Sequence, residues 1–367
     1  MPDASHNDAV LIFPAGMPRA LEFLGQCRRQ GRKALGASSL AYDPARQRYD
    51  RWLTLPYVTA ADFDAALRRA VAEHGVTGIY TPHVVVWDYL NRRLADIAPG
   101  VALLNASPLD EELAAYRTAL DAAPAFLSQP LPLASSLPAQ PPQPEAEIAA
   151  LLRHFAAIPG MCDLDKLKAL YEIARRCPQG DVVEIGSWWG KSAFALLWLA
   201  QRYAIGKLLC VDPWENAQLL QHDADPLVDR LAADRLDADE ALRIFQINLL
   251  PYSRNDCNYL RMGSLEAAAH YGRQPTVQTP GFGTTAYQGG IALLHIDGNH
   301  AYDSVKADIE AWSVHMADGG WIVVDDYRWP FGDGPRRAGD EFLQTHRATI
   351  RAAFVAGGAL YLQRAAH

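Results

Sequence analysis

The sequence predicts an α/β protein with two domains, each built on a mainly parallel sheet that helices cover on both faces. Three observations carry this prediction. Short apolar runs alternate with amphipathic helical patterns in both halves of the chain, as in repeated strand–helix units. A proline-rich segment separates the two halves. With 367 residues, half of them hydrophobic, the chain is long enough for two cores.

The composition excludes several classes of protein. The net charge of −8 argues against a general electrostatic grip on nucleic acid or an anionic membrane. No apolar run approaches the roughly 18 residues of a spanning helix, and the first residues lack the basic start of a secretory signal. The five cysteines are scattered and form no CxxC pair, which indicates reduced thiols rather than disulfides or a zinc site. We therefore expect a cytoplasmic protein.

Residues 1–123 are predicted to form a small Rossmann-like α/β domain. Apolar runs that end in turn residues indicate strands, and spacings of three and four between apolar residues indicate helices. The expected strands are 9–16, 32–40 and 76–83, and the expected helices are 17–31, 59–75 and 84–97.

Residues 124–145 are predicted to be a linker. Seven of the 24 prolines lie between Pro124 and Pro144. Because proline fixes φ and lacks a backbone donor, such a run should join neither a helix interior nor a central strand. It is typical of an extended connection between folded parts.

Residues 146–367 repeat the alternation with stronger signals. Helices are expected at 146–158, 163–176, 191–204, 302–315 and 336–349, and strands at 181–186, 207–212, 258–264, 291–298 and 319–327. Residues 352–364 have the pattern of a terminal hairpin, which would add an antiparallel strand to the sheet. The stretch 271–290 is rich in Gly, Pro, Thr and Gln and is predicted to be an inserted loop.

The sharpest local signal is the segment VVEIGSWWGKSAFALL, in which a strand ends at Gly186 and a helix begins after Gly190. In open α/β sheets, ligands bind at the carboxyl ends of the strands, where a helix N-terminus offers N–H groups to an anion. Asp212 ends the next strand, about 20 residues beyond Gly190, which is the spacing of an acid that holds ribose hydroxyls.

Several interpretations of this glycine loop compete. A phosphate-binding loop needs four residues between its glycine and GKS, and this one has three. A dinucleotide fingerprint needs a glycine where Trp188 stands. The looser loop of an S-adenosylmethionine site remains, with Glu184 and the helix N-terminus holding the methionine part of the cofactor. A plain strand-to-helix turn is the alternative.

Acidic residues follow two further strands. Asp297 ends the expected strand 291–298, and Asp325 and Asp326 end the strand 319–327. Parallel strands place these acids at the same sheet edge as Gly186. Oxygen ligands of this kind suit Mg²⁺, Mn²⁺ or Ca²⁺ rather than zinc, although single acids at strand ends also serve as helix caps.

His300 lies three residues after Asp297, on the turn into the next helix. A histidine there can act as a general base, as a metal ligand or as an ordinary surface residue. His295 lies inside an apolar strand and is predicted to be a core residue with satisfied nitrogens. The tryptophans at 188, 189 and 214 flank the glycine loop, where packing is their expected role.

From about residue 146 to the end, the chain resembles class I S-adenosylmethionine-dependent methyltransferases, most of all the metal-dependent sugar O-methyltransferases of macrolide and aminocoumarin biosynthesis. The segments that carry the resemblance are VEIGSWWGKSA, VDPWE, the GS of RMGSLEAA, HIDGNHAYDSVKADIEAW, GGWIVVDDY and GDEF. It implies a class I methyltransferase fold with S-adenosyl-L-methionine and Mg²⁺ (or Mn²⁺) as cofactors.

The resemblance also implies roles for single residues. Asp297, Asp325 and Asp326 would hold the metal, and His300 would be the catalytic base. The cofactor would be bound by Glu184, Gly186, Ser187, Gly190, Ser192, Asp212, Ser264 and Asp297. The segments 213–257 and 271–290 match nothing in the family, and we expect them to cover the acceptor site.

The segments VLIFPAGMPRALEFL, GASSL and GIYTPH resemble the Rossmann-like domain that precedes the catalytic body of ATP-grasp ligases, but no such body follows. A packing or dimerisation role for the first domain is at least as well supported as ligand binding by Gly16.

The sequence therefore predicts methyl transfer to a hydroxyl of a small polyhydroxylated acceptor, such as a sugar or natural product. A binding or scaffold protein that keeps the cofactor fold without turnover is the alternative, and a nicotinamide-dependent oxidoreductase is disfavoured by the missing fingerprint. We expect no nucleic-acid or membrane partner, and self-association is left open.

Overall fold

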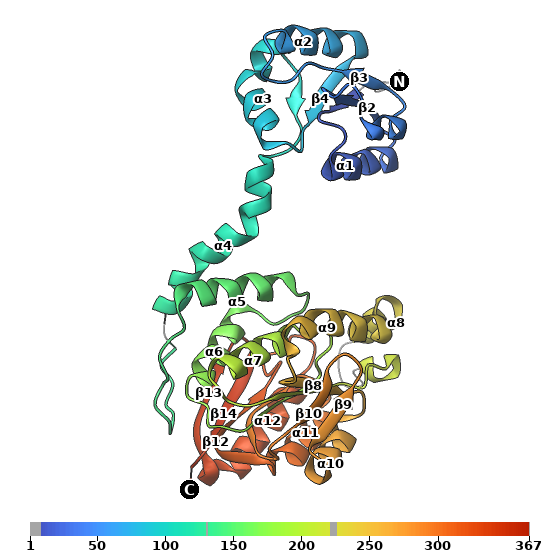
Figure 1. Ribbon diagram of the computed structural model, residues 1–367. Coiled ribbons are helices and arrows are strands. Elements are labelled where there is room, and N and C mark those ends of the chain that lie inside the picture. The colour runs from blue at the N-terminus through green and yellow to red at the C-terminus, as the bar shows by residue number, and fades with distance from the viewer. Residues whose placement is uncertain (1–8, 130, 221–225, 367) are drawn as a thin grey trace. The chain divides into compact units, whose positions relative to one another are not determined.

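The computed structural model describes residues 9–129, 131–220 and 226–366, apart from the side chain at 233. Contacts divide the chain into two compact units, one ending at Arg117 and the other beginning at Thr118. Each is described here by itself (Figure 1).

The first unit is a five-stranded parallel sheet in the order β3-β2-β1-β4-β5. Its elements are β1 (Ala9–Ile12), α1 (Pro18–Arg29), β2 (Lys33–Ser38), β3 (Trp52–Thr54), α2 (Phe63–His74), β4 (Val76–Tyr80), α3 (Val84–Ile97) and β5 (Ala102–Leu103). Along β1, Leu11 packs in the core under α2 and α3, whereas Ile12 packs in the core under α1. This alternation covers both faces of the sheet, as the sequence predicts.

Helix α4 (Pro108–Ser128) follows the first unit and continues into the second. Pro124 lies inside this helix, so the prediction that the linker begins there is wrong. A helix tolerates proline at the loss of one backbone hydrogen bond. Here Ala123 is buried in the core of the second unit, and Phe126 and Leu127 pack against that core, so the helix has tertiary contacts on both sides of the proline.

Residues 131–144, in the proline-rich segment after α4, form neither helix nor strand and lie along the second unit. The backbone N–H of Gln140 donates to the carbonyl of Arg175 at 2.7 Å. The Gln363 amide oxygen accepts from the N–H of Ser136, and its nitrogen donates to the hydroxyls of Ser135 and Ser136. These residues therefore form a strap on the second unit.

The second unit contains a seven-stranded sheet in the order β13-β14-β12-β11-β6-β7-β8. Its helices are α5 (Glu145–Ala157), α6 (Leu164–Ala174), α7 (Lys191–Arg202), α8 (Pro226–Arg235), α9 (Ala238–Ser253), α10 (Ser264–Arg273), α11 (Tyr302–Ser313) and α12 (Gly334–Thr345). Its strands in this sheet are β6 (Asp181–Ile185), β7 (Leu208–Val211), β8 (Cys257–Leu260), β11 (Ile291–Ile296), β12 (Met316–Val324), β13 (Ile350–Ala356) and β14 (Ala359–Arg364).

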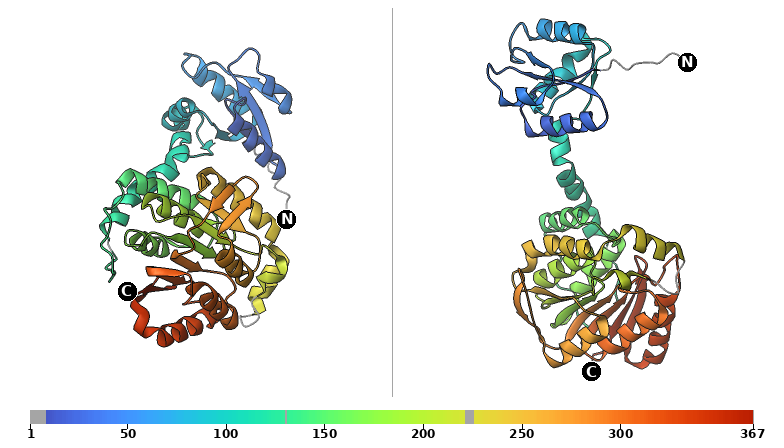
Figure 2. Two further views of the ribbon diagram at one scale, coloured as in Figure 1. Left: turned by 60° about the horizontal axis from the view of Figure 1, so that its bottom comes forward. Right: turned by 90° about the vertical axis from the view of Figure 1, so that its right-hand side faces the viewer.

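Strands β8, β7, β6, β11 and β12 are parallel, and β14 pairs antiparallel with β12. The prediction of a mainly parallel sheet with an antiparallel terminal strand is confirmed. Successive residues of β6 point to opposite faces: Val182 packs in the core with α5, α6, α7 and α9, and Val183 packs in the core with α10, α11 and α12. Figure 2 shows these helices on both faces of the sheet.

The segment 271–290 contains a hairpin, β9 (Thr276–Thr279) and β10 (Gly283–Ala286), rather than an irregular loop. The N–H groups of Gln288 and Gly289 donate to the carboxylate of Asp181, and the Tyr287 hydroxyl donates to the carbonyl of Leu208. Asp181 and Leu208 are the first residues of their strands. The hairpin is thus anchored at the amino ends of the strands, opposite the edge at which the predicted site residues lie, and this argues against the expectation that it covers the acceptor site.

All five cysteines are buried with free thiols, as the sequence predicts. A buried free cysteine packs like a small hydrophobic side chain, and this is the role we assign to these five. Among the described residues, no helix combines the length and the apolar character that crossing a bilayer requires.

Candidate active site

The predicted site residues follow the carboxyl ends of β6, β7, β8, β11 and β12, which lie side by side in the sheet. The glycine turn 186–190 comes after β6, Asp212 after β7, Ser264 after β8, Asp297 after β11, and Asp325 and Asp326 after β12. Parallel pairing places all of these loops at one edge of the sheet.

The glycine turn after β6 lies directly against the loop after β11. Gly186 has a φ of 81°, a left-handed conformation that glycine adopts without strain. A Cβ at this position would lie 2.0 Å from the backbone carbonyl oxygen of Asp297. The cofactor loop and the candidate metal loop therefore meet at this glycine.

We expect Gly186→Ala to lower the free energy of unfolding by at least about 2 kcal/mol, because it combines a backbone clash with a left-handed φ. Thermal unfolding checks the change. Gly263→Ala is the matched control, since a Cβ at Gly263 meets nothing within 4 Å and its φ is −63°. Equal stability of the two variants would contradict this account of Gly186.

Asp212 ties the loops after β6 and β7 together. Its carboxylate accepts from the backbone N–H of Trp188 at 3.0 Å and from that of Trp214 at 2.7 Å. The Trp214 indole N–H donates back to the carbonyl of Trp188 at 3.0 Å, and its ring is buried, so packing is its role, as expected. Burial raises the pKa of Asp212 to about 6, against the opposing effect of the two backbone donors.

Two buried atoms at the glycine turn lack a hydrogen-bond partner among the described residues. They are Oε2 of Glu184 and Oγ of Ser187. A buried polar atom without a partner is costly and needs an explanation. A bound ligand with an amino group and hydroxyls would satisfy both, so these residues fit S-adenosylmethionine.

The remaining predicted cofactor residues differ in their surroundings. Gly190 precedes helix α7 with a φ of 87°, and a Cβ there would lie 2.5 Å from the Leu249 side chain. Ser192 is buried in the first turn of α7. The hydroxyl of Ser264 accepts from the Trp312 indole at 3.0 Å. Their contacts with the cofactor remain predictions.

Asp297, His300 and Asp326 form a compact group with ligand atoms that lie within 4.8 Å of one another. His300 Nε2 is 2.9 Å from Asp326 Oδ2 and 3.8 Å from Asp297 Oδ1. Asp326 has a left-handed φ of 50°, which aspartate adopts more readily than most residues and which turns it away from the path of β12. The side chains of Asp297 and Asp326 are 26% and 35% exposed, so a cation from solvent could reach both.

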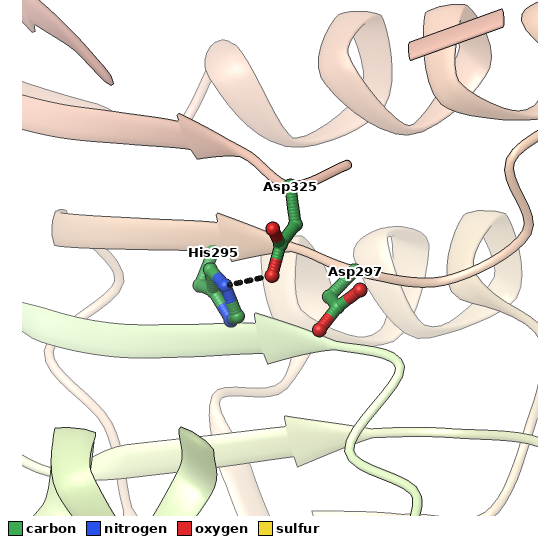
Figure 3. A group of neighbouring side chains, drawn as sticks. All are labelled: His295, Asp297 and Asp325. Carbon is green, nitrogen blue, oxygen red and sulfur yellow. Dashed lines mark hydrogen bonds and ion pairs between the residues drawn. The ribbon is translucent and has the colours of Figure 1, made fainter. Parts of the chain in front are cut away.

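Asp325 has different neighbours, although it too lies within 4.8 Å of Asp297 (Figure 3). Its Oδ2 forms an ion pair with Lys166 and lies 3.3 Å from His295 Nε2, and its Oδ1 accepts from the N–H of Asp326 at 2.7 Å. The residue is buried. Both of its oxygens are thus engaged within the protein.

His295 is fully buried between two acids, with Nδ1 3.1 Å from Glu184 Oε1. Burial opposes its positive charge, but the hydrogen bonds to Asp325 and Glu184 raise its pKa to about 10. Burial would raise the pKa of Asp325, but His295 and Lys166 hold it below the usual range. Lys166, Asp325, His295 and Glu184 therefore form a buried chain of alternating charge.

The pKa values of Asp297 and His300, in the partly exposed group, are also shifted. Burial and the charge of Asp325 raise the pKa of Asp297 to about 7. Burial opposes the charge of His300, but Asp297 and Asp326 raise its pKa to about 9. While both acids face it without a compensating cation, His300 therefore carries a proton at neutral pH.

Lys166 is the residue that sequence reasoning missed. It lies on α6, 159 residues before Asp325, in a pattern that resembles an ordinary amphipathic helix. One signal was available: Lys166 falls on the buried face of this helix, where an unpaired lysine is rarely found.

A hollow of about 410 Å³ opens beside this group. It is lined by Tyr327, Arg328, Trp329, Pro330, Gly332, Asp333 and Arg336. The Trp329 ring lies on the imidazole of His300, with 4.6 Å between ring centres. The segment after Asp212 lies next to the loop that bears His300, since the side-chain amide of Asn299 donates a hydrogen bond to the carbonyl of Leu220 at 2.8 Å.

Residues 183–327 match the family model of a methyltransferase domain, which spans β6 to the turn after β12. The comparison with curated proteins gives no match. The matched segment contains the glycine turn, Asp212 and the carboxylates described above.

Solved structures with a similar fold include the O-methyltransferase NovP, at 17% identity over 55% of this chain and 79% of that chain, with a TM-score of 0.39. They also include CalS11, a TDP-rhamnose 3'-O-methyltransferase of calicheamicin biosynthesis, at 16% identity over 71% and 96%, with a TM-score of 0.38. A third is MycE of the mycinamycin pathway, in complex with Mg and SAH, at 16% identity over 51% and 46%, with a TM-score of 0.29. At such low identity and overlap these likenesses say nothing about substrate.

Proposed function

Since residues 183–327 match the family model of a methyltransferase domain, we propose that the second unit is a class I enzyme that transfers the methyl group of S-adenosylmethionine to a hydroxyl of a small polyhydroxylated acceptor, with the help of a divalent cation. The single observation that carries the proposal is the contact of the glycine turn with the Asp297 loop. It supports a methyl donor bound at the glycine turn next to the acidic group on the sheet edge.

Glu184, Ser187 and Asp212 are proposed to hold the methyl donor. The partnerless Glu184 Oε2 and Ser187 Oγ would take up hydrogen bonds from the methionine part. Asp212 would accept from the ribose hydroxyls at the end of β7. These contacts fix the sulfonium relative to the acceptor, and positioning of this kind accounts for much of the rate of a group transfer.

Asp297 and Asp326 are the residues available to hold a cation, because both are partly exposed and, within the described parts of the chain, His300 is their ion-pair partner. A divalent cation bound there would lower the pKa of an acceptor hydroxyl and offset the charge of the two acids. His300 then takes the proton from that hydroxyl at Nε2. The acceptor oxygen forms a bond to the methyl carbon as the carbon–sulfur bond breaks, which leaves S-adenosylhomocysteine.

The hollow lined by residues 327–336 is proposed as the acceptor site. Its walls combine aromatic faces with the polar groups of Arg328, Asp333 and Arg336. Small-molecule sites typically combine apolar walls with a few placed polar groups. A ring with several hydroxyls fits this lining better than an apolar one, since the arginines and the acid offer both donors and acceptors.

We expect Trp329→Ala to raise the KM of the acceptor about ten-fold through lost contact area, with an unchanged affinity for S-adenosylhomocysteine. Steady-state kinetics and calorimetry check the two parts. Phe331→Ala is the matched control, because Phe331 lies on the same loop and is exposed but does not line the hollow. A rise in KM for Phe331→Ala, without one for Trp329→Ala, would contradict the proposal that the acceptor binds in this hollow.

The experiment that tests the function is a transfer assay with radiolabelled S-adenosylmethionine and a panel of free and nucleotide-linked sugars, with and without EDTA. Label in at least one hydroxylated acceptor, lost with EDTA and restored by Mg²⁺ or Mn²⁺, is the expected result. Tight cofactor binding without transfer to any acceptor and without any metal effect would instead favour a scaffold.

A further inference from the structure

Lys166 introduces a positive charge into the acidic cluster from outside the strands that bear the acids. The helix that carries it, α6, begins after Asp163, whose carboxylate caps it by accepting from the N–H of Lys166 at 2.7 Å. The turn between β13 and β14 fixes the helix from the other side. Gly357 there has a φ of 53°, and a Cβ on it would lie 2.4 Å from the Lys166 backbone nitrogen.

The position of α6 places the ammonium group of Lys166 next to the carboxylate of Asp325. The side chain of Lys166 is 7% exposed and that of Asp325 is 1% exposed, and the two form a direct ion pair. A buried pair is held by the cost of leaving either charge alone. The second partner of Asp325 Oδ2 is His295, at 3.3 Å, and its Oδ1 accepts from the Asp326 N–H.

The two neighbouring acids are in a different situation. The side chains of Asp297 and Asp326 are 26% and 35% exposed. Each forms an ion pair with His300. A divalent cation arriving from solvent meets these two carboxylates first. To reach Asp325 it would have to displace a buried lysine.

We infer that Lys166 is the resident cation of this cluster and that it withholds Asp325 from the divalent-cation site, which then consists of Asp297 and Asp326 beside His300. The inference rests on the cation site of the proposed function. It differs from the sequence-based expectation, in which all three acids are ligands. It also predicts that the lysine limits the affinity for the metal.

The test is direct binding of Mn²⁺, measured by electron paramagnetic resonance of the free ion, without any turnover. Lys166→Met frees Asp325, so we expect Mn²⁺ to bind at least about ten-fold more tightly than to the wild type. Lys166→Met/Asp325→Asn, which removes both charges of the pair, should return the affinity to the wild-type value. Asp326→Asn should weaken binding about ten-fold or more.

Lys168→Met is the matched control. Lys168 lies on the same helix and pairs with Glu172 at 3.2 Å, away from the acids, so its loss should leave Mn²⁺ binding unchanged. Thermal unfolding of each variant checks that it is folded. If Lys166→Met does not fold, the comparison of the wild type with the charge-neutral double variant still decides the matter.

Four results would overturn the inference. Weaker Mn²⁺ binding by the double variant than by the wild type would make Asp325 a ligand. A gain in Lys166→Met that persists in the charge-neutral double variant would show that the gain does not come from freeing Asp325. An equal gain in Lys168→Met would be a general charge effect, and absence of Mn²⁺ binding in every protein would remove the site. Transfer assays on the same samples separate the two proposals. The expected pattern of Mn²⁺ binding without any methyl transfer would contradict the proposed function but would still support the role inferred for Lys166.

Discussion

Asp326→Ala is expected to abolish metal-dependent methyl transfer while leaving the affinity for S-adenosylhomocysteine unchanged. Asp326 is one of two exposed carboxylates beside His300, and it lies 2.9 Å from the imidazole. Under the proposed function, loss of this ligand would remove the polarisation of the acceptor that the cation supplies, an effect worth several kcal/mol of transition-state stabilisation. The measurement is initial rate against Mg²⁺ concentration, with calorimetry for the cofactor.

Asp318→Ala is the control for this variant, because Asp318 lies near the other end of the same strand, β12, and is about half exposed. It should retain wild-type rate and metal response. Undiminished transfer by Asp326→Ala, or indifference of the wild type to EDTA, would remove the metal from the mechanism. Asp326→Asn separates the loss of charge from the strain of the left-handed φ, which asparagine tolerates.

His300→Ala is expected to lower kcat by about 10² or more, the usual contribution of a positioned general base. His300 lies beside the two candidate ligands, and the ring of Trp329, which lines the hollow, lies on its imidazole. Rates measured at saturating acceptor and cofactor isolate this effect from binding.

His346→Ala is the matched control, since His346 is an exposed histidine after helix α12. It should leave kcat unchanged. A wild-type kcat for His300→Ala would show that His300 is not the general base. A loss of cofactor affinity in the same variant would instead point to a structural role.

Much of the fold could be predicted because its signals are local. The apolar run before Gly186 and the helical spacing after Gly190 predict β6 and α7, and the order of such units predicts a parallel sheet. The site residues at the strand ends follow from the same reasoning, since Gly186 and Asp297 follow neighbouring strands and lie so close that a Cβ on Gly186 would be 2.0 Å from the Asp297 carbonyl oxygen.

Other features depend on contacts between distant residues, which a local pattern does not encode. Pro124 lies inside α4, in a stretch where Ala123 is buried in the core of the second unit and Phe126 and Leu127 pack against it. The hairpin within 271–290 lies at the amino ends of the strands because Asp181 accepts its backbone donors. Lys166 joins Asp325 across 159 residues, so the pair appears only in the folded chain.

The central claim is that the methyl donor and the cation share one place at the sheet edge. Paramagnetic broadening by Mn²⁺ of the proton resonances of bound S-adenosylhomocysteine tests it most directly. We predict strong broadening of the protons next to sulfur in the wild type and none in Asp297→Asn/Asp326→Asn. Sharp resonances in a wild-type sample that binds both ligands would contradict the account.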